Sequence, residues 1–200
     1  MKPFTIGPAS AEHLPYVPDI VNAILEAAKA KGTGLAKRSP EYITDKITQG
    51  KAVIALHNGV FAGFCYIESW EHEKYVATSG LIVKPEYRGH GLATAIKKEA
   101  FHLARRKFPG AKIFGLTTSL AVMRINSDLG FVPVTFTELT SDQEFWKGCE
   151  SCQYFDVLGR SGNKNCLCTG MIFDPSPKVK EWKRKKSSSL SLAVLTPPMQ

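Results

Sequence analysis

Apolar residues at helical spacing dominate the first part of the chain. The segment 17–31 carries them three and four positions apart, which predicts an amphipathic helix. Gly32 and Gly34 follow this segment and are expected to end it. A second helix is expected after Ser39, which can cap it, with Pro40 at its first position.

The pattern then changes to short apolar runs typical of strands. The runs 51–56 and 60–69 flank His57-Asn58-Gly59, and Asn-Gly between apolar runs is typical of a hairpin. The later elements are expected to be strands over 75–83, 112–118, 130–139 and 166–173 and helices over 92–107 and 121–128. Helices, then an antiparallel meander with a β-loop-α-β unit after it, predict an α+β fold with a mixed, largely antiparallel sheet.

Length and charge narrow the class of protein. The 200 residues suit one domain, which we expect over 1–175. The formal net charge is +8, of which residues 178–186 supply +5 (six basic and one acidic), so +3 remains elsewhere. We therefore expect a flexible basic tail over 176–200, with docking to a polyanion as the alternative. The remaining charge suits an anionic cofactor and does not call for a nucleic-acid partner.

The apolar runs also bear on location. None approaches the ~20 residues that span a bilayer. The first residues lack the basic and apolar pattern of a secretory signal. A cytoplasmic protein without a membrane partner is expected, and its oligomeric state stays open, a homodimer being one alternative.

One loop carries the chemistry. Arg88-Gly89-His90-Gly91-Leu92-Ala93 lies between the expected strand 75–83 and the helix 92–107. The first turn of a helix presents unpaired N–H groups and a partial positive charge, so an anion binds there. Gly89 and Gly91 let the backbone approach phosphates, and Arg88 adds a full charge.

This strand, loop and helix resemble motif A of the GNAT superfamily of acetyltransferases. The resemblance implies a sheet with a splayed strand pair, acetyl-CoA as donor, pantetheine held by Leu81, Ile82 and Val83, and a backbone N–H of Leu81 or Ile82 at the thioester oxygen. It also implies that the pyrophosphate is held by Arg88, Gly89, His90, Gly91, Leu92, Ala93 and Thr94.

Two further stretches narrow the resemblance. Residues 114–132 and 35–43 are similar to segments of the acetyltransferase domain of N-acetylglutamate synthases. This implies transfer of an acetyl group to the amine of a small amino acid, glutamate in arginine biosynthesis. The alternatives are a succinyl-CoA-dependent transferase, a protein or peptide N-acetyltransferase, and a non-catalytic acyl-CoA-binding module.

The proton chemistry departs from the family pattern. Where the family places a strand Glu, this chain has Ala77. Glu68 on the neighbouring strand is the candidate base, and His72 is the alternative. The family's usual acid is a Tyr four residues before Gly-Phe, where this chain has Asn126, so Asn126 is expected to bind the cofactor and Thr117 to donate the proton.

Two basic residues are the candidates for binding the acceptor. Lys37 and Arg38 lie between the first two helices, a segment that borders the acceptor site in the family. Arg binds a carboxylate through two parallel hydrogen bonds. These residues are therefore expected to bind the acceptor's carboxylates, the alternative being a pair of solvated cations.

Four cysteines form two close pairs. Cys149 and Cys152 are followed by Cys166 and Cys168 within the segment 149–173, which is expected to pack on the domain. Four thiolates can hold structural zinc, and on a strand the second pair would share one face. Buried free thiols and a redox or acyl-carrying role are the alternatives.

Overall fold

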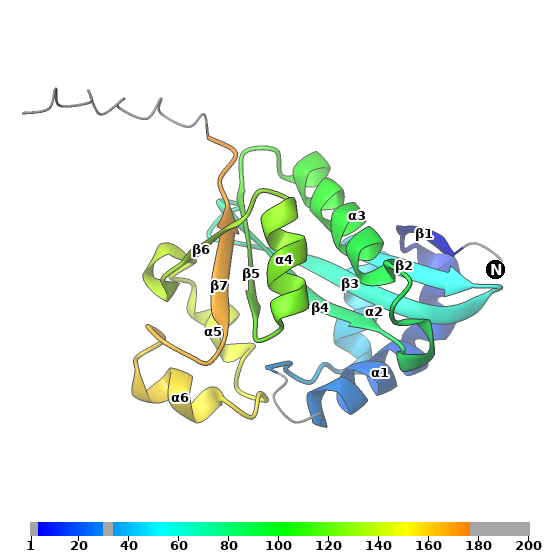
Figure 1. Ribbon diagram of the computed structural model, residues 1–200, viewed down its shortest axis with the longest axis horizontal. Coiled ribbons are helices and arrows are strands. Elements are labelled where there is room, and N and C mark those ends of the chain that lie inside the picture. The colour runs from blue at the N-terminus through cyan, green and yellow to red at the C-terminus, as the bar shows by residue number, and fades with distance from the viewer. Residues whose placement is uncertain (1–3, 30–33, 177–200) are drawn as a thin grey trace, which may run out of the picture.

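The computed structural model describes residues 4–29 and 34–176. These residues form a seven-stranded sheet in the order β1-β2-β3-β4-β5-β7-β6, with helices on both faces (Figure 1). The strands are β1 (Thr5–Pro8), β2 (Ala52–His57), β3 (Val60–Trp70), β4 (Tyr75–Val83), β5 (Lys112–Thr117), β6 (Val132–Val134) and β7 (Thr169–Phe173). The helices are α1 (Val17–Lys29), α2 (Pro40–Thr48), α3 (Leu92–Lys107), α4 (Leu120–Asp128), α5 (Gln143–Lys147) and α6 (Phe155–Arg160). Three short 3-10 helices are also present among the described residues: η1 (Ala11–Tyr16), η2 (Pro85–Tyr87) and η3 (Phe136–Glu138).

Local sequence signals account for the first elements. The Ser39 hydroxyl accepts a hydrogen bond from the Tyr42 N–H at 3.2 Å, and Pro40 opens α2, as predicted. Asn58 and Gly59 both have positive φ, 52° and 77°, which is the conformation that a two-residue hairpin requires. The α+β fold class and the hairpin are confirmed.

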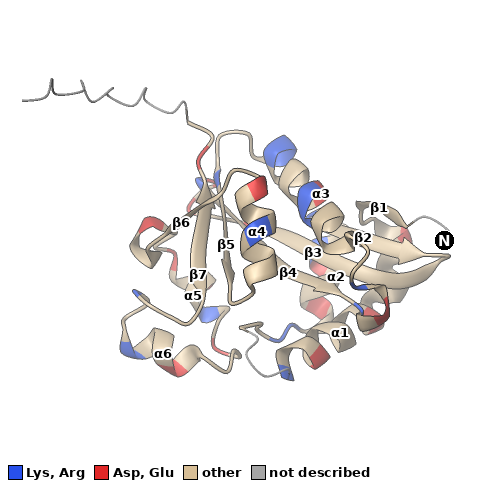
Figure 2. Cartoon of the chain, in the orientation of Figure 1, with Lys and Arg blue, Asp and Glu red and all other residues tan. Residues whose placement is uncertain are grey.

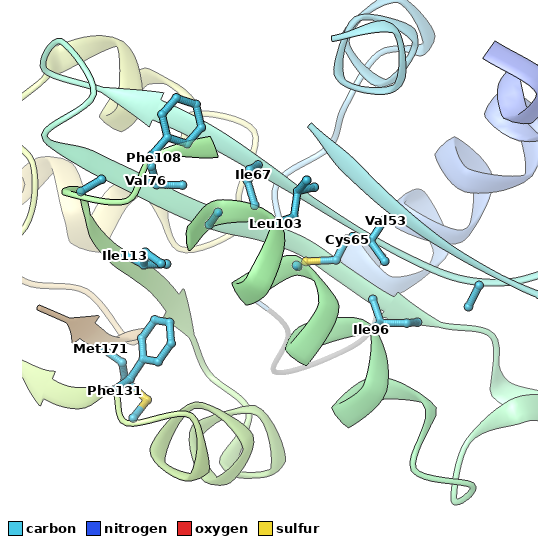
Figure 3. Packing of buried hydrophobic residues seen from close by; sticks show 14 of the residues in the cluster. Val53, Cys65, Ile67, Val76, Ile96, Leu103, Phe108, Ile113, Phe131 and Met171 are labelled. Atoms are coloured by element: carbon cyan, nitrogen blue, oxygen red, sulfur yellow. The ribbon is translucent and has the colours of Figure 1, made fainter. Parts of the chain in front are cut away.

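Helices cover the two faces of the sheet separately. In Figure 1, α3 and α4 lie in front of the sheet and α2 lies behind it. Figure 3 shows the core on the α3 side, where Ile96 and Leu103 meet strand residues such as Val53 and Ile67. On the other face, α1 and α2 bury isoleucines, including Ile20, against β2 and β3. The sheet therefore separates two apolar layers. A ligand or side chain can pass between these layers only where neighbouring strands of the sheet diverge.

The strands part between β4 and β5. These two strands are parallel and pair only at Tyr75, Val76 and Ala77 of β4. Beyond Ala77 they diverge, as Figure 1 shows, while β4 continues alongside β3 as far as Val83. This is the splayed pair that the family resemblance implied. On the β5 side, β4 has no strand partner after Ala77 among the described residues.

Few charged residues lie on the strands. The strands hold Glu68 and Lys112, and the other charged residues of the described chain lie on helices and connections (Figure 2). No described helix has both the length and the apolar character to cross a membrane.

Several sequence predictions differ from the structure. Residues 130–139 form only the short strand β6, because the chain then turns into η3 and buries Phe136 against Trp146 at a ring distance of 5.6 Å. The predicted strand 166–173 begins only at Thr169 in β7, so Cys166 and Cys168 precede it and the prediction that they share a strand face is wrong. The strand β1 and the helices α5 and α6 were not predicted. The expected basic tail lies outside the described residues, apart from Ser176.

Candidate active site

The N-terminus of α3 is open toward the loop before it. Gly89 and Gly91 have positive φ, 79° and 73°, and nothing lies within 4 Å of where a side chain would begin at either position. No side chain caps α3, because its N-cap is Gly91. The first N–H groups of a 16-residue helix are therefore available to an anion.

Arg88 braces this loop against the strand that leads into it. Its Nε donates to the carbonyl oxygen of Val83 at 3.1 Å, and its side chain is exposed. His90 is also exposed, whereas Leu92 is buried in the core. Leu92 can therefore serve the loop only through its backbone, and Arg88 and His90 are the side chains that face solvent here.

The free edge of β4 runs from this loop back to the point where β4 and β5 part. A β-bulge interrupts its pairing with β3 between Ser79 and Ile82. Gly80 has a φ of 64° there, and a Cβ on it would lie 2.5 Å from the ring of Tyr66. Only glycine fits this bend. The bulge turns the strand on its β3 side, and the opposite edge has no strand partner here among the described residues.

A cavity of about 360 Å³ lies behind this parting. Its lining includes Ser79 of β4 and Gly115 of β5, which flank the opening, and the segment before α2. Aromatic side chains, including Trp70 and Phe155, form much of its wall. The cavity therefore combines an apolar body with a direct opening between the strands.

Arg38 brings a partly buried positive charge to this cavity. Its Nε donates to the Tyr66 hydroxyl at 2.8 Å, and its Nη1 donates to the carbonyl oxygens of Lys37 and Gly148 at 2.8 and 3.1 Å. Burial opposes the charged form, but Tyr66 and Tyr42 outweigh it, and the pKa of Arg38 is raised. No acceptor contacts its Nη2 among the described residues. Arg38 is thus fixed in place with one nitrogen free to bind an anion.

Lys37 also lines the cavity, from an exposed position. Its backbone N–H donates to the Ser151 hydroxyl at 3.0 Å, which joins the segment before α2 to the chain near the cysteines. The two predicted acceptor residues therefore border the same cavity, and Arg38 is the more rigidly held.

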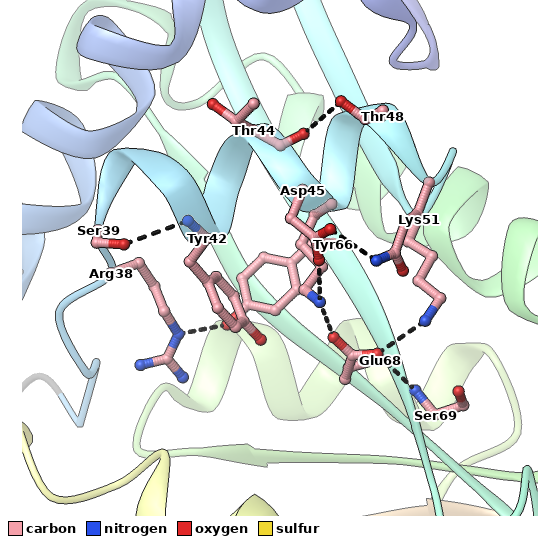
Figure 4. Close-up of polar contacts among 12 residues, drawn as sticks. Arg38, Ser39, Tyr42, Thr44, Asp45, Thr48, Lys51, Tyr66, Glu68 and Ser69 are labelled. Atoms are coloured by element: carbon pink, nitrogen blue, oxygen red, sulfur yellow. Dashed lines mark hydrogen bonds and ion pairs between the residues drawn. The ribbon is translucent and has the colours of Figure 1, made fainter.

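Glu68 faces the cavity from β3 and stands opposite Ala77 of β4 in the sheet register. Its carboxylate forms an ion pair with Lys46. It also pairs with Lys51 at 2.9 Å and accepts a hydrogen bond from the Ser69 N–H (Figure 4). Lys46 is itself buried, and its contacts with Glu68 and Asp45 overcome the effect of burial and raise its pKa. The candidate base is therefore a paired carboxylate beside the position where the family places its Glu.

Two other proton-transfer candidates lie elsewhere. His72 is exposed on the turn between β3 and β4, with a φ of 52°, and does not line the cavity. Thr117 ends β5, and its hydroxyl accepts a hydrogen bond from the Ser119 N–H at 3.0 Å, which shapes the entry to α4. Thr117 does not line the cavity either.

Asn126 is buried on α4, and its side-chain nitrogen lies 3.6 Å from the sulfur of Met171. Its side-chain oxygen has no hydrogen-bond partner among the described residues. A buried acceptor without a partner costs free energy, so this oxygen suits a donor that arrives with a ligand.

The four cysteines gather at the cavity wall, packed against an aromatic cluster that includes Phe114. Burial and Cys152 raise the pKa of Cys149 to about 11, and burial and Cys166 raise that of Cys168 to about 12. No set of three or more His, Cys, Asp or Glu side chains is arranged to hold a metal ion in the described residues. The possible zinc site at Cys149, Cys152, Cys166 and Cys168 is thus unsupported within the described part of the chain.

The sequence pattern did not single out Lys97 as a candidate site residue. It lies on the buried face of α3 with 2% of its surface exposed, and its Nζ donates to the Thr78 hydroxyl at 2.5 Å. A Cβ on Gly115 would lie 3.7 Å from the same Nζ. The one available signal was a lysine within the small apolar stripe Ala93, Ala100 and Ala104 of a helix.

The sequence matches the model of the acetyltransferase (GNAT) family over residues 21–125. No curated protein matches it. Among solved structures, the N-acetylglutamate synthase from Neisseria gonorrhoeae complexed with coenzyme A and N-acetyl-glutamate has 18% identity and a TM-score of 0.62. That match covers 88% of this chain and 36% of the synthase, so the chain spans about a third of the synthase's length.

Two shorter proteins match over most of their own length. Rv2747 from Mycobacterium tuberculosis, in complex with CoA and NLQ, has 18% identity and a TM-score of 0.62, with 85% of this chain and 98% of that chain covered. A phosphinothricin acetyltransferase from Sinorhizobium meliloti, in complex with AcCoA, has 15% identity and a TM-score of 0.58, with 86% and 88% covered. At these identities the likeness to solved structures shows the fold.

Proposed function

Since the chain belongs to the acetyltransferase (GNAT) family, we propose that it transfers an acetyl group from acetyl-CoA to the amine of a small amino acid. The observation that carries this proposal is the parting of β4 and β5, with an open helix N-terminus at one end and the Arg38 cavity behind it. Glutamate is the first candidate acceptor, since a synthase that forms N-acetylglutamate shares the fold.

The donor fits the loop and the free strand edge. Gly89 and Gly91 leave open space over the first N–H groups of α3, which would hold the pyrophosphate together with Arg88. The edge of β4 from Ser79 to Val83 would offer backbone groups to the pantetheine arm. Asn126 would offer its side-chain oxygen, which has no partner in the part of the chain that the structure describes. When bound, acetyl-CoA supplies an activated acetyl group as a thioester.

The cavity suits an acceptor with a carboxylate and a compact body. Nη2 of Arg38 would bind the carboxylate, because its other nitrogens are already committed to Tyr66, Lys37 and Gly148. Lys37 would meet a second carboxylate such as that of glutamate. The aromatic wall favours a second class of acceptor, amino acids with apolar side chains, for which Arg38 alone would supply the charge.

Glu68 would accept the proton from the attacking amine. Directly opposed residues on paired strands lie about 5 Å apart at Cβ, so Glu68 reaches the space beside Ala77 directly or through one water. Lys46 and Lys51 hold the carboxylate at this edge of the cavity. The base would thus come from β3 rather than β4.

An acceptor screen tests the proposal. Thiol release is measured with acetyl-CoA and, in parallel, succinyl-CoA, over glutamate, glutamine, apolar amino acids and a lysine peptide. We expect acetyl transfer to a free amino acid and a raised acceptor KM for Arg38→Ala. Binding of CoA without turnover on any amino acid would contradict the proposal, and turnover on peptides that is indifferent to Arg38→Ala would assign a protein acetyltransferase instead.

A further inference from the structure

Lys97 occupies the narrow end of the parting between β4 and β5. The last paired positions of these strands are Ala77 and Phe114, and the next residues are Thr78 and Gly115. Nζ of Lys97 contacts the Thr78 hydroxyl, which in turn donates to the Phe114 carbonyl oxygen at 3.2 Å, and it lies close to Gly115. The amino group is therefore held between the strands where they begin to diverge.

This position lies at the far end of the proposed donor path. Lys97 is six positions after Gly91, which corresponds to about 9 Å along the helix axis. An arm that started at the α3 N-terminus and followed the free edge of β4 from Val83 to Thr78 would end near Nζ, because Nζ contacts the Thr78 hydroxyl. The reacting sulfur would then lie at this end of the arm.

Lys97 has no carboxylate partner in the part of the chain that the structure describes. Its Nζ lies 5.9 Å from the centre of the Phe131 ring, and Cys65 of β3 is the titratable group that acts on it from the strands. Burial lowers the pKa of Lys97, and Cys65 partly opposes this shift. A buried amine without a counter-ion favours its neutral form, and a negative charge that arrived beside it would favour the ammonium form.

We propose that Lys97 is the catalytic acid of this enzyme and donates its Nζ proton to the departing sulfur. This inference rests on the proposed function. Lys97 approaches the opening from the α3 face of the sheet, whereas Glu68 lies on the cavity face. The two proton-transfer groups would therefore stand on opposite sides of the opening, each beside the substrate that it serves.

Acyl transfer would form one bond, break another and move two protons. The acceptor nitrogen forms the C–N bond to the acyl carbon, and its proton passes to Glu68. The C–S bond breaks, its electron pair stays on sulfur, and a proton from Lys97 completes the thiol. Glu68 releases its proton to solvent and Lys97 regains one from solvent, so no further reactant is needed.

Ultraviolet difference absorbance of bound CoA tests the contact without any acceptor. Beside the Lys97 ammonium, the thiol of bound CoA is expected to ionise at lower pH than in free CoA, because the thiolate and the cation attract each other in a poorly solvated site. The matched variants are Lys97→Met and Lys98→Met, since Lys98 is the exposed neighbour on the same helix. Desulfo-CoA supplies the blank.

The expected result is thiolate absorbance at lower pH in the wild type and in Lys98→Met, and its loss in Lys97→Met with CoA binding and Tm retained. An unchanged thiol titration in Lys97→Met would overturn the inference. If CoA does not bind at all, the proposed function and this inference fail together. If CoA binds and the thiol responds but no acceptor is turned over, only the proposed function fails.

Turnover gives a second readout. Lys97→Met is expected to lower kcat by about 10²-fold with little change in the KM of the acceptor, and Lys98→Met to leave both unchanged. The acid must be protonated, so kcat of the wild type should fall with rising pH below the ordinary pKa of lysine. Lys97→Met should lack this alkaline limb, and its persistence there would count against Lys97.

Discussion

In the proposed mechanism, the Glu68 side chain serves chemistry as well as stability. Its carboxylate neutralises Lys46, which is 5% exposed, and it stands where the proposed attacking amine would lose its proton. For Glu68→Gln we expect kcat per folded molecule to fall by about 10²-fold. Turnover is measured with acetyl-CoA and the identified acceptor, and the folded fraction by circular dichroism.

The variant also leaves Lys46 buried beside a neutral partner, so Tm should fall as well. The matched control is Glu73→Gln on the exposed turn, which should change neither value. Full turnover by the folded fraction of Glu68→Gln would remove Glu68 from the mechanism.

The thiols at the cavity wall are expected to react slowly at neutral pH. Only the thiolate attacks an alkylating reagent, and the raised pKa values of Cys149 and Cys168, about 11 and about 12, leave little thiolate there. Labelling with iodoacetamide, located by mass spectrometry, should speed up as pH rises toward these values. The unfolded protein supplies the reference, and equally fast labelling of folded and unfolded protein at neutral pH would contradict the structure.

At the scale of elements, the loop before α3 depends on backbone conformation. Gly91 has a φ of 73° with open space around it, so Gly91→Ala strains the backbone without a clash. We expect a loss of about 1–2 kcal/mol in the free energy of unfolding and weaker CoA binding. Urea denaturation and calorimetric titration measure the two effects.

Gly110→Ala is the matched control, since Gly110 has equally open space and its φ is not positive. A Gly91→Ala protein as stable and as tightly bound to CoA as the control would show that the left-handed conformation is not needed there.

The elements with strong local signals were predictable, and those set by packing were not. The cap at Ser39 and the Asn58-Gly59 turn act through neighbouring residues, so their positions follow from sequence. The strand β1 has only four residues, and α5 has five, which is too short for a periodic pattern. The strand predicted over 130–139 failed because burial of Phe136 beside Trp146 overrides alternation.

The residues of the candidate site also fall into those that local sequence predicts and those that only packing places. The glycine loop and Arg38 could be found because loop spacing and residue type carry their chemistry. Lys97 could not, because the register of α3 against β4 and β5 places its amino group, and no local pattern records that distance. The pairing of Glu68 with Lys46 and Lys51 likewise joins β3 to α2 and to the connection that follows it.

At the scale of the whole molecule, the sheet is held together at its middle by a short junction. In the described residues, β4 and β5 pair as strands at only three positions, so a ligand along the free edge of β4 would connect the two parts. We expect saturating CoA to raise the Tm, since a ligand at about 100 times its Kd contributes about 2.7 kcal/mol. Differential scanning calorimetry measures the shift, and an unchanged Tm in the presence of excess CoA would contradict the proposed site.

The unpartnered edge of β4 also bears on aggregation. An open strand edge with apolar side chains is a template for a strand from another chain, and Leu81, Ile82 and Val83 lie along this one. A bound pantetheine arm would cover it. We therefore expect concentrated protein to self-associate faster without CoA than with it, as followed by light scattering, whereas 3′-phosphoadenosine 5′-diphosphate, which lacks the arm, should protect less. The ligand of this fold would then also serve as the missing strand that keeps the sheet from pairing with its neighbours.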